Sequence, residues 1–463
     1  MTNQEKYNTL RKTHPVFVYE SYQYNVQPDG LHIVFSFRQG EDCWFTPETI
    51  VPHRGFLTFD QPKATMDALV FNIGMVEMVS YWKSACAPRV EVKCGNLDDG
   101  QRAFWKKLYW NGLGEFFYVN GIEATIDDFM TIDAGEHTAG CVEPLFNEGR
   151  QKMNEQAYLV PIGGGKDSVV SLELLQPCGT ADISQRPVPL IMNPRGATVG
   201  CIEAAGYNMD DVLVMHRTID PHLLKLNSQG YLNGHTPFSA MLAFYTLMAA
   251  QLSGISNIAL SNESSANEST VLGTGVNHQY SKSLEFENDL RAYVARYLPG
   301  GYNYFSLLRP LTELQIAALF SRHEKYHDVF RSCNAGSKQD VWCGKCAKCL
   351  FAYIILSPFI APERMMTIFG KNMLDDPSMQ REFDQLTGRA ETKPFECVGT
   401  VDEVHQALSM TLERWYQTRK RPALLEEYRE RPVHMRLDSC LPDHNLNENE
   451  INLLLSHVRG ITT

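Results

Sequence analysis

The sequence predicts an α/β protein with a parallel sheet covered by helices, preceded by an α+β domain and followed by a helical extension. Three observations predict this architecture. Short apolar strands alternate with helical segments from about residue 157, which is the pattern of a parallel sheet with helices on both faces. Strand-like and helix-like segments are mixed before residue 150, and the chain is helical and charged after residue 395. The 463 residues leave room for two or three domains.

The first 150 residues change repeatedly between an alternating and a helical apolar pattern. The alternating pattern predicts strands at residues 16–19 and 31–37. Apolar residues recur at helical spacing over residues 71–83 and 101–108. We therefore predict an α+β domain over residues 1–150.

The central sheet is predicted from four strand-like segments, each followed by a helix. We expect strands at residues 158–163, 188–193, 211–215 and 257–262, and helices at residues 167–175, 198–205, 238–251 and 281–297. Ligands of such sheets bind at the carboxyl ends of the strands. These units define a predicted domain over residues 151–330, and the last helices define an extension over residues 395–463.

Composition limits the class of protein and its partners. Hydrophobic residues make up 44% and charged residues 21%, which is typical of globular proteins. The longest apolar stretch, residues 240–250, is too short to span a bilayer and is predicted to be a buried helix. The polar N-terminus leads into no apolar segment of a secretory signal. We expect a cytoplasmic protein with no membrane partner. The formal charge of −12 disfavours nucleic acid as a partner, because the acidic chain repels it. The charge does not exclude the binding of small anionic ligands.

A run of three glycines lies between the first strand and the first helix of the central domain. Glycines let the backbone approach a phosphate closely, and a helix that starts just after them directs its free N–H groups at that phosphate. Val160 and Asp167 depart from a Walker A loop at two positions. A glycine turn without a ligand is the alternative. The predicted nucleotide loop consists of Gly163, Gly164, Gly165, Lys166, Asp167 and Ser168.

This loop resembles the Ser-Gly-Gly-x-Asp-Ser loop of the N-type ATP pyrophosphatases, with Gly163 in place of the serine. The resemblance implies the adenine-nucleotide alpha-hydrolase (PP-loop) fold for the central sheet, and ATP cleavage to AMP and pyrophosphate with Mg²⁺. It also implies that Asp167 helps to place the Mg²⁺. In this superfamily the second strand ends near the adenine, which places Asn193 beside the nucleotide. The fourth strand ends in Asn262 and Glu263 at the same crevice.

Four of the 12 cysteines are closely spaced in the pattern C-x9-C-x2-C-x2-C. In a reducing compartment such a cluster indicates a metal site, and four thiolates fit a closed, structural zinc site. The alternatives for these cysteines are an iron–sulfur cluster and unligated thiols. A similar arrangement in the 7-cyano-7-deazaguanine synthases favours zinc. The predicted ligands, in a metal module over residues 331–394, are Cys333, Cys343, Cys346 and Cys349.

Several longer strings are similar to one family, the MurL-type UDP-N-acetylmuramoyl-L-alanyl-L-glutamate epimerases. The likeness covers nearly the whole chain. It implies an ATP- and magnesium-dependent inversion of the terminal L-glutamate of a peptidoglycan precursor, which is a small-molecule substrate. The strings are residues 112–118, 161–168, 233–238, 261–268, 276–283 and 394–400.

The implied inversion requires a proton to leave the glutamate α-carbon and return from the other face. An acyl-adenylate makes this proton easier to remove than a free carboxylate does, and each 1.4 kcal/mol off the barrier is about tenfold in rate. His235 and His278 are the leading acid and base, because a neutral imidazole can transfer protons near pH 7. The alternatives are Glu263, Glu268, Tyr280 and Lys282. Candidates for binding the substrate's carboxylate or diphosphate are Arg195, Arg217, Lys282 and Arg291.

The sequence does not exclude other functions. An adenylating ligase, or an enzyme like the 7-cyano-7-deazaguanine synthases, would share ATP activation of a carboxylate but end with attack by nitrogen. Nucleic-acid modification is disfavoured by the acidic chain. A nucleotide-binding regulator is disfavoured by the number of polar residues near the predicted crevice. The oligomeric state is not predicted.

Overall fold

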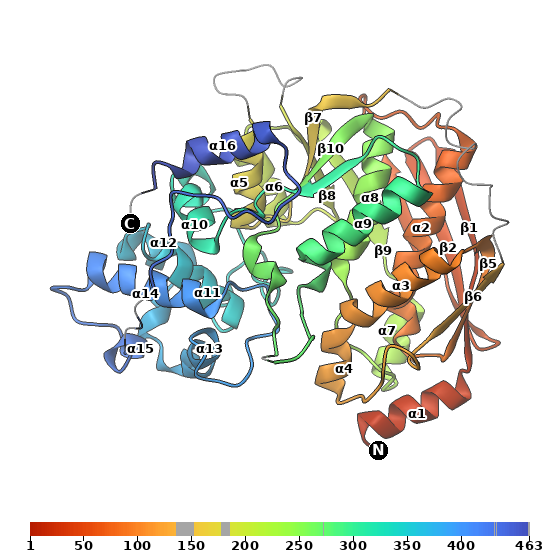
Figure 1. Ribbon diagram of the computed structural model, residues 1–463, viewed down its shortest axis with the longest axis horizontal. Helices are drawn as coiled ribbons and strands as arrows, with labels where there is room; N and C mark the ends of the chain where they lie inside the picture. The colour runs from red at the N-terminus through yellow and green to blue at the C-terminus, as the bar shows by residue number, and fades with distance from the viewer. Residues whose placement is uncertain (136–151, 177–185, 272, 430, 432, 462–463) are drawn as a thin grey trace. The chain divides into compact units, whose positions relative to one another are not determined.

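The computed structural model describes residues 1–135, 152–176, 186–271, 273–429, 431 and 433–461 (Figure 1). The chain divides into two compact units, each assembled from three segments. Unit 1 consists of Met1–Leu159, Leu213–Ile258 and Gly275–Tyr304. Unit 2 consists of Val160–Val212, Ala259–Thr274 and Phe305–Thr463.

Unit 1 contains a sheet whose strands lie in the order β9-β4-β2-β1-β5-β6, with β3 beside β2. The bounds are β1 Val16–Gln27, β2 Gly30–Gln39, β3 Cys43–Phe45, β4 Glu48–Pro52, β5 Arg89–Asn96, β6 Thr131–Gly135 and β9 Leu213–Thr218. Strands β1 and β2 form a hairpin in which Gln27 is opposite Gly30. A two-residue loop therefore joins them, as is common for hairpins.

The sheet is mixed, and the prediction of a parallel sheet is wrong in this respect. Strand β9 was expected among the parallel strands, but it pairs antiparallel with β4, with Thr49 opposite Arg217. Strands β1 and β2 are also antiparallel, whereas β1 and β5 are parallel. The predicted parallel pairing does hold for β7 (Asn154–Pro161) and β10 (Ile255–Leu260), where Ile258 is opposite Leu159. The reason for the error is that β9 hydrogen-bonds to a strand from the first 150 residues.

Several helices of unit 1 pack on this sheet. Helix α2 packs on β1, β2 and α8, and the residues of α2 from Leu69 to Trp82 are buried. Helix α8 includes the apolar stretch predicted to be a buried helix, and it is buried almost throughout. The bounds are α1 Asn3–Thr13, α2 Lys63–Trp82, α3 Asp99–Gly112, α4 Gly114–Asn120, α7 Pro221–Ser228, α8 Phe238–Ser253 and α9 Leu284–Tyr297.

Three strands contain a boundary between the units, so that the chain passes from one unit to the other within them. They are β7 Asn154–Pro161, β10 Ile255–Leu260 and β11 Asn303–Ser306. The end of β7 leads into the glycine loop, and the end of β10 leads into Asn262 and Glu263. Polar candidates therefore follow these strands, as the sequence predicts.

Unit 2 is mainly helical. Helix α10 packs on α5, α11, α14 and α16, and helices α11, α13 and α14 lie beside one another in blue in Figure 1. Every residue of α11 is buried. The bounds are β8 Val188–Met192, α5 Lys166–Leu175, α6 Gly196–Ala204, α10 Glu313–Ser321, α11 Ala347–Leu356, α12 Pro362–Phe369, α13 Gln380–Leu386, α14 Val401–Trp415, α15 Ala423–Glu426 and α16 Glu448–Val458. The predicted helical C-terminal region is confirmed. Within the described ranges, no helix is long and apolar enough to cross a membrane.

Candidate functional site

The glycine loop connects the end of β7 to the start of α5. Gly164 has φ 82°, which is the left-handed region that favours glycine. A Cβ at this position would lie 3.0 Å from the backbone of Ala197 and Thr198 at the start of α6. Helix α5 begins at Lys166 after Gly165, and no side chain caps its N-terminus. The loop therefore combines a close backbone approach with uncapped helix N–H groups, which together suit a phosphate.

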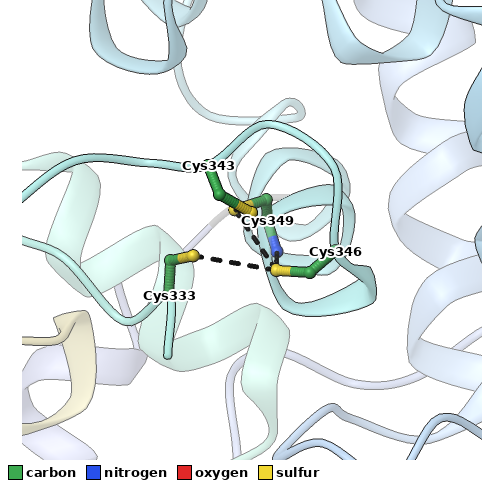
Figure 2. A group of neighbouring side chains, drawn as sticks. All are labelled: Cys333, Cys343, Cys346 and Cys349. Carbon is green, nitrogen blue, oxygen red and sulfur yellow. Dashed lines mark hydrogen bonds between the residues drawn. The ribbon is translucent and has the colours of Figure 1, made fainter. Parts of the chain in front are cut away.

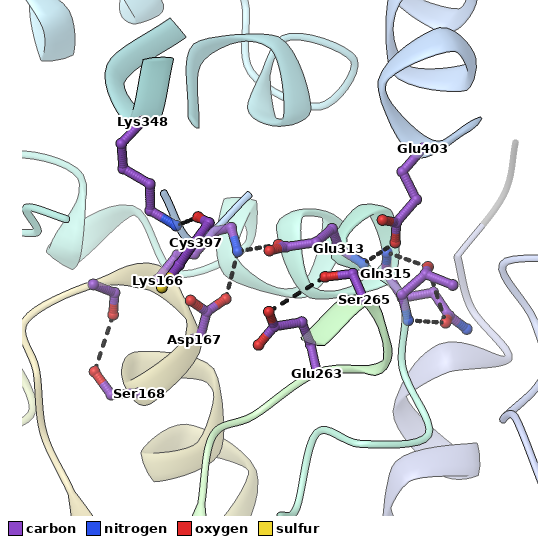
Figure 3. A network of polar contacts seen from close by, with 12 residues as sticks. Lys166, Asp167, Ser168, Glu263, Ser265, Glu313, Gln315, Lys348, Cys397 and Glu403 are labelled. Carbon is purple, nitrogen blue, oxygen red and sulfur yellow. Dashed lines mark hydrogen bonds and ion pairs between the residues drawn. The ribbon is translucent and has the colours of Figure 1, made fainter. Parts of the chain in front are cut away.

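Lys166 is buried in unit 2, where its ammonium contacts the carboxylates of Asp167 and Glu313 (Figure 3). Only 4% of Lys166 and 1% of Glu313 are exposed. Burial by itself lowers the pKa of Lys166, but the two carboxylates outweigh it and hold the pKa above its ordinary value. Lys166 is thus a buried, charged group whose partners are two carboxylates.

Glu313 is held by its backbone as well as by Lys166. It is the first residue of α10, and its N–H donates to Glu403 over 2.6 Å. The same carboxylate of Glu403 accepts from the N–H of Thr400 over 2.7 Å, so that it satisfies donors at the starts of α10 and α14. Burial raises the pKa of Glu313 above its ordinary value, and Lys166 opposes this. The surroundings of Glu313 therefore favour its protonated form, even with Lys166 beside it.

The other predicted nucleotide residues also belong to unit 2. The hydroxyl of Ser168 donates to the carbonyl of Gly165 over 3.1 Å. Asn193 directly follows β8 and has φ 52°, a conformation that asparagine tolerates better than most residues. The amide of Asn262 donates to the Ser306 hydroxyl over 2.9 Å. Glu263 is buried and accepts from Ser265 over 3.3 Å (Figure 3).

The four clustered cysteines converge in unit 2 (Figure 2). Their sulfur atoms lie 3.8 Å apart for Cys333 and Cys346, 3.7 Å for Cys343 and Cys349, and 3.5 Å for Cys346 and Cys349. Four sulfurs bound tetrahedrally at the usual 2.3 Å from one zinc ion would be roughly 3.8 Å apart. The cluster therefore has the geometry of a metal site, and its donor set is compatible with zinc.

The cysteine cluster is connected to the glycine loop. Arg331, two residues before Cys333, donates its N–H to the carbonyl of Gly164 over 2.7 Å. Lys348 lies between Cys346 and Cys349 and contacts the carbonyl of Cys397 (Figure 3). A metal that orders the cysteines would therefore also order a segment that supports the loop.

A second polar cluster lies in unit 1, where His235 and His278 meet Glu115. Each imidazole directs its Nδ1 at the same carboxylate oxygen, at 3.1 Å for His235 and 2.5 Å for His278. The two ring centroids are 4.6 Å apart. Burial lowers the pKa of His235 to about 4, with a further contribution from His278, so its ring is neutral at pH 7. The structure thus brings together the two histidines that the sequence singled out.

A glycine and a lysine position this cluster. Gly234 has φ 154°, and a Cβ there would lie 3.1 Å from the Phe116 ring, next to Glu115. The absence of a side chain lets the loop that carries His235 approach helix α4. The buried ammonium of Lys83 contacts the carbonyl of Gly234 and the hydroxyl of Thr236. Burial lowers the pKa of Lys83 to about 8.

The remaining candidates are placed as follows. Lys282 is half-buried at the end of the short helix Tyr280–Lys282 in unit 1. Arg217 forms a buried ion pair with Glu77, which also accepts from Tyr245 over 2.8 Å. Arg291 donates to the Tyr304 carbonyl in the same unit. Arg195 is exposed. Arg217 therefore already has a structural carboxylate partner.

Sequence reasoning missed two carboxylates. Glu115 appeared only within a longer family-like string, and Glu313 was not singled out at all. Glu115 is distant in sequence from both histidines, and Glu313 lies 147 positions after Lys166. No local spacing could reveal either pairing. The only signal for Glu313 was Thr312 followed by Gln315, which marks a helix start and nothing more.

Three curated proteins similar to this chain bear the name UDP-N-acetyl-alpha-D-muramoyl-L-alanyl-L-glutamate epimerase. The protein from a Micromonospora species is 35% identical over 83% of this chain and 81% of its own length. Those from Xanthomonas oryzae pv. oryzae and Salinispora tropica are 34% and 35% identical, over 82% and 79% of this chain and 82% and 78% of their own lengths. The chain is therefore an enzyme of the isomerase class.

Family models give the more particular assignment. The model of the MurL N-terminal domain matches residues 8–307, and that of the MurL C-terminal domain matches residues 329–437. The chain belongs to the MurL family of epimerases. The two matched regions together include the glycine loop, the histidine cluster and the cysteine cluster.

Proposed function

We propose that this enzyme inverts the terminal L-glutamate of UDP-N-acetylmuramoyl-L-alanyl-L-glutamate to D-glutamate, in the synthesis of peptidoglycan precursors. The single observation that carries this proposal is the shared name of three relatives that are 34–35% identical along most of the chain. The loop, the cysteine cluster and the histidine cluster support it, because each lies within the regions matched by the family models.

We infer that ATP activates the glutamate α-carboxylate. The proposed phosphate-binding groups are the backbone of Gly163, Gly164 and Gly165, the ammonium of Lys166 and the hydroxyl of Ser168. Lys166 would exchange Glu313 for a phosphate, so its own charge stays paired, and Glu313, whose pKa burial raises, would take up a proton. Asp167 is the proposed ligand of the Mg²⁺ that accompanies ATP, directly or through water. The PP-loop fold for this region is part of the same proposal, as are adenine contacts by Asn193 and Asn262.

The need for ATP in an epimerisation is kinetic. Substrate and product are diastereomers of similar free energy, so ATP does not drive the equilibrium. Removing the α-proton beside a free carboxylate would put two negative charges on one enolate. The carbonyl of an acyl-adenylate is uncharged, so the carbanion is better stabilised and the barrier is lower. We propose adenylation, loss of the α-proton, its return from the other face, and final hydrolysis of the adenylate to AMP.

The groups that move the proton are proposed among His235, His278, Glu263 and Lys282. Inversion requires an acid and a base on opposite faces of the α-carbon. The rings of His235 and His278 are only 4.6 Å apart, which leaves no room for a carbon atom between them. In this arrangement the two histidines do not serve opposite faces. At least one face therefore needs Glu263, Lys282 or another group.

We propose that the cysteine cluster holds a structural zinc ion. Four thiolates occupy all positions of a tetrahedral site and leave none for substrate. The zinc ion would fix residues 333–349 and, through the hydrogen bond from Arg331 to Gly164, support the nucleotide loop. Its proposed role is thus to position the loop.

Substrate-dependent AMP formation tests this function. We expect ATP and Mg²⁺ to yield equal amounts of AMP and pyrophosphate in the presence of UDP-N-acetylmuramoyl-L-alanyl-L-glutamate. UDP-N-acetylmuramoyl-L-alanine, which lacks the glutamate, is the matched control and should yield neither product. A reaction product that carries an amide in place of the α-carboxylate would instead identify an adenylating ligase.

A further inference from the structure

We propose that Glu115, His235 and His278 bind a divalent transition-metal ion of the zinc type, at a second metal site distinct from the cysteine cluster. This inference goes beyond the proposed function, which requires only Mg²⁺ with ATP and zinc at the cysteines. All three residues belong to unit 1, whereas the four cysteines belong to unit 2.

The geometry of the three side chains carries the proposal. One oxygen of Glu115 lies 3.1 Å from Nδ1 of His235 and 2.5 Å from Nδ1 of His278. One ligand atom from each residue lies within 4.8 Å of the other two. Tetrahedral ligands at about 2.0–2.2 Å from a zinc ion are roughly 3.3–3.6 Å apart. Small side-chain movements would therefore place all three atoms around one ion.

The charge around Glu115 points the same way. The carboxylate is only 17% exposed, and the described residues include no lysine or arginine in an ion pair with it. Lys83 is close enough to affect the cluster, but its ammonium contacts the Gly234 carbonyl and the Thr236 hydroxyl. Within that part of the chain, the Glu115 carboxylate contacts two imidazoles and forms no ion pair with a lysine or arginine, so a metal ion between the three groups would supply positive charge.

The donor set indicates which ion and which kind of site. Two imidazole nitrogens and one carboxylate oxygen suit zinc and its neighbours Co²⁺, Ni²⁺ and Fe²⁺ better than Mg²⁺. Three protein ligands leave at least one coordination position open, unlike the four cysteines. The open position would accept water or an anionic substrate oxygen. With a metal on these nitrogens, neither histidine would carry the proton at the α-carbon, which leaves Glu263 and Lys282 among the proposed groups.

Metal content of the full chain tests the proposal. After equilibration with zinc and removal of the excess, we expect two zinc ions per wild-type chain and one in Glu115→Gln, which keeps the side-chain shape but removes the charge. His222→Ala is the matched control, because His222 is an exposed histidine of the same unit that also lies beside a carboxylate, Asp220. It should retain two ions. A thermal melt confirms that each variant is folded.

Cobalt binding to the unmodified protein gives a readout that needs no variant. We expect a second equivalent of Co²⁺ whose visible absorption lacks thiolate charge-transfer bands, and we expect His278→Ala to lose it. A wild-type chain that binds one ion only, or that binds two with no effect of Glu115→Gln, would overturn the proposal. Neither measurement uses substrate or turnover, so the result is independent of whether the proposed epimerisation is correct.

Discussion

The double substitution Lys166→Met and Glu313→Gln is expected to lower the rate of AMP formation by about a hundredfold or more, in a protein that remains folded. Lys166 is the cation of the proposed phosphate loop, and methionine cannot neutralise the phosphates. Substrate-dependent AMP release, followed by chromatography, measures the effect. A double variant that forms AMP at the wild-type rate would remove Lys166 from the ATP site.

The second substitution is needed because of the buried ion pair. Lys166→Ala alone would leave the Glu313 carboxylate buried without its partner, which typically costs about 3–5 kcal/mol. Loss of activity could then reflect unfolding. The matched control is Arg217→Met with Glu77→Gln, which removes a buried ion pair of unit 1 in the same way. We expect the control to keep AMP formation at a similar loss of thermal stability.

Cys346→Ser is expected to release the metal of the cysteine cluster and to lower the melting temperature by about 10 °C or more, because structural zinc contributes several kcal/mol to folding. Since Arg331 links this segment to Gly164, AMP formation should fall as well. Elemental analysis and a thermal melt measure the two effects.

The matched control for this cluster is Cys440→Ser. Cys440 is a half-buried cysteine of unit 2 that does not belong to the cluster. We expect its replacement to leave metal content and AMP formation close to wild type. A Cys346→Ser protein with unchanged metal content and melting temperature would show that these sulfurs are unligated thiols.

Local patterns in the sequence predicted most individual elements but not their pairing. The strand-loop-helix around the glycines and the buried helix α8 were found because apolar periodicity and glycine runs are local signals. The direction of β9 was not predictable in this way, because it depends on a partner strand more than 160 residues earlier, with Thr49 opposite Arg217. The continuous apolar run of residues 212–215 indicates a strand buried on both faces, but it does not identify the partner strand.

The same limit applies to the site. The cysteines were predictable as a group because three of the four lie within seven residues. His235 and His278 were predicted separately, and the carboxylate that joins them, Glu115, was not. Arg217 looked like a surface cation available to substrate, but a buried partner, Glu77, holds it. The four-domain division and the acid and base stay predictions.

Epimerisation in heavy water tests the central claim most directly. The enzyme is incubated with ATP, Mg²⁺ and UDP-N-acetylmuramoyl-L-alanyl-L-glutamate in D₂O, and the glutamate is then released for chiral analysis and mass measurement. An ATP-activated carbanion predicts D-glutamate with deuterium at the α-carbon, together with AMP. AMP without inversion, or D-glutamate that keeps its original α-hydrogen, would contradict it.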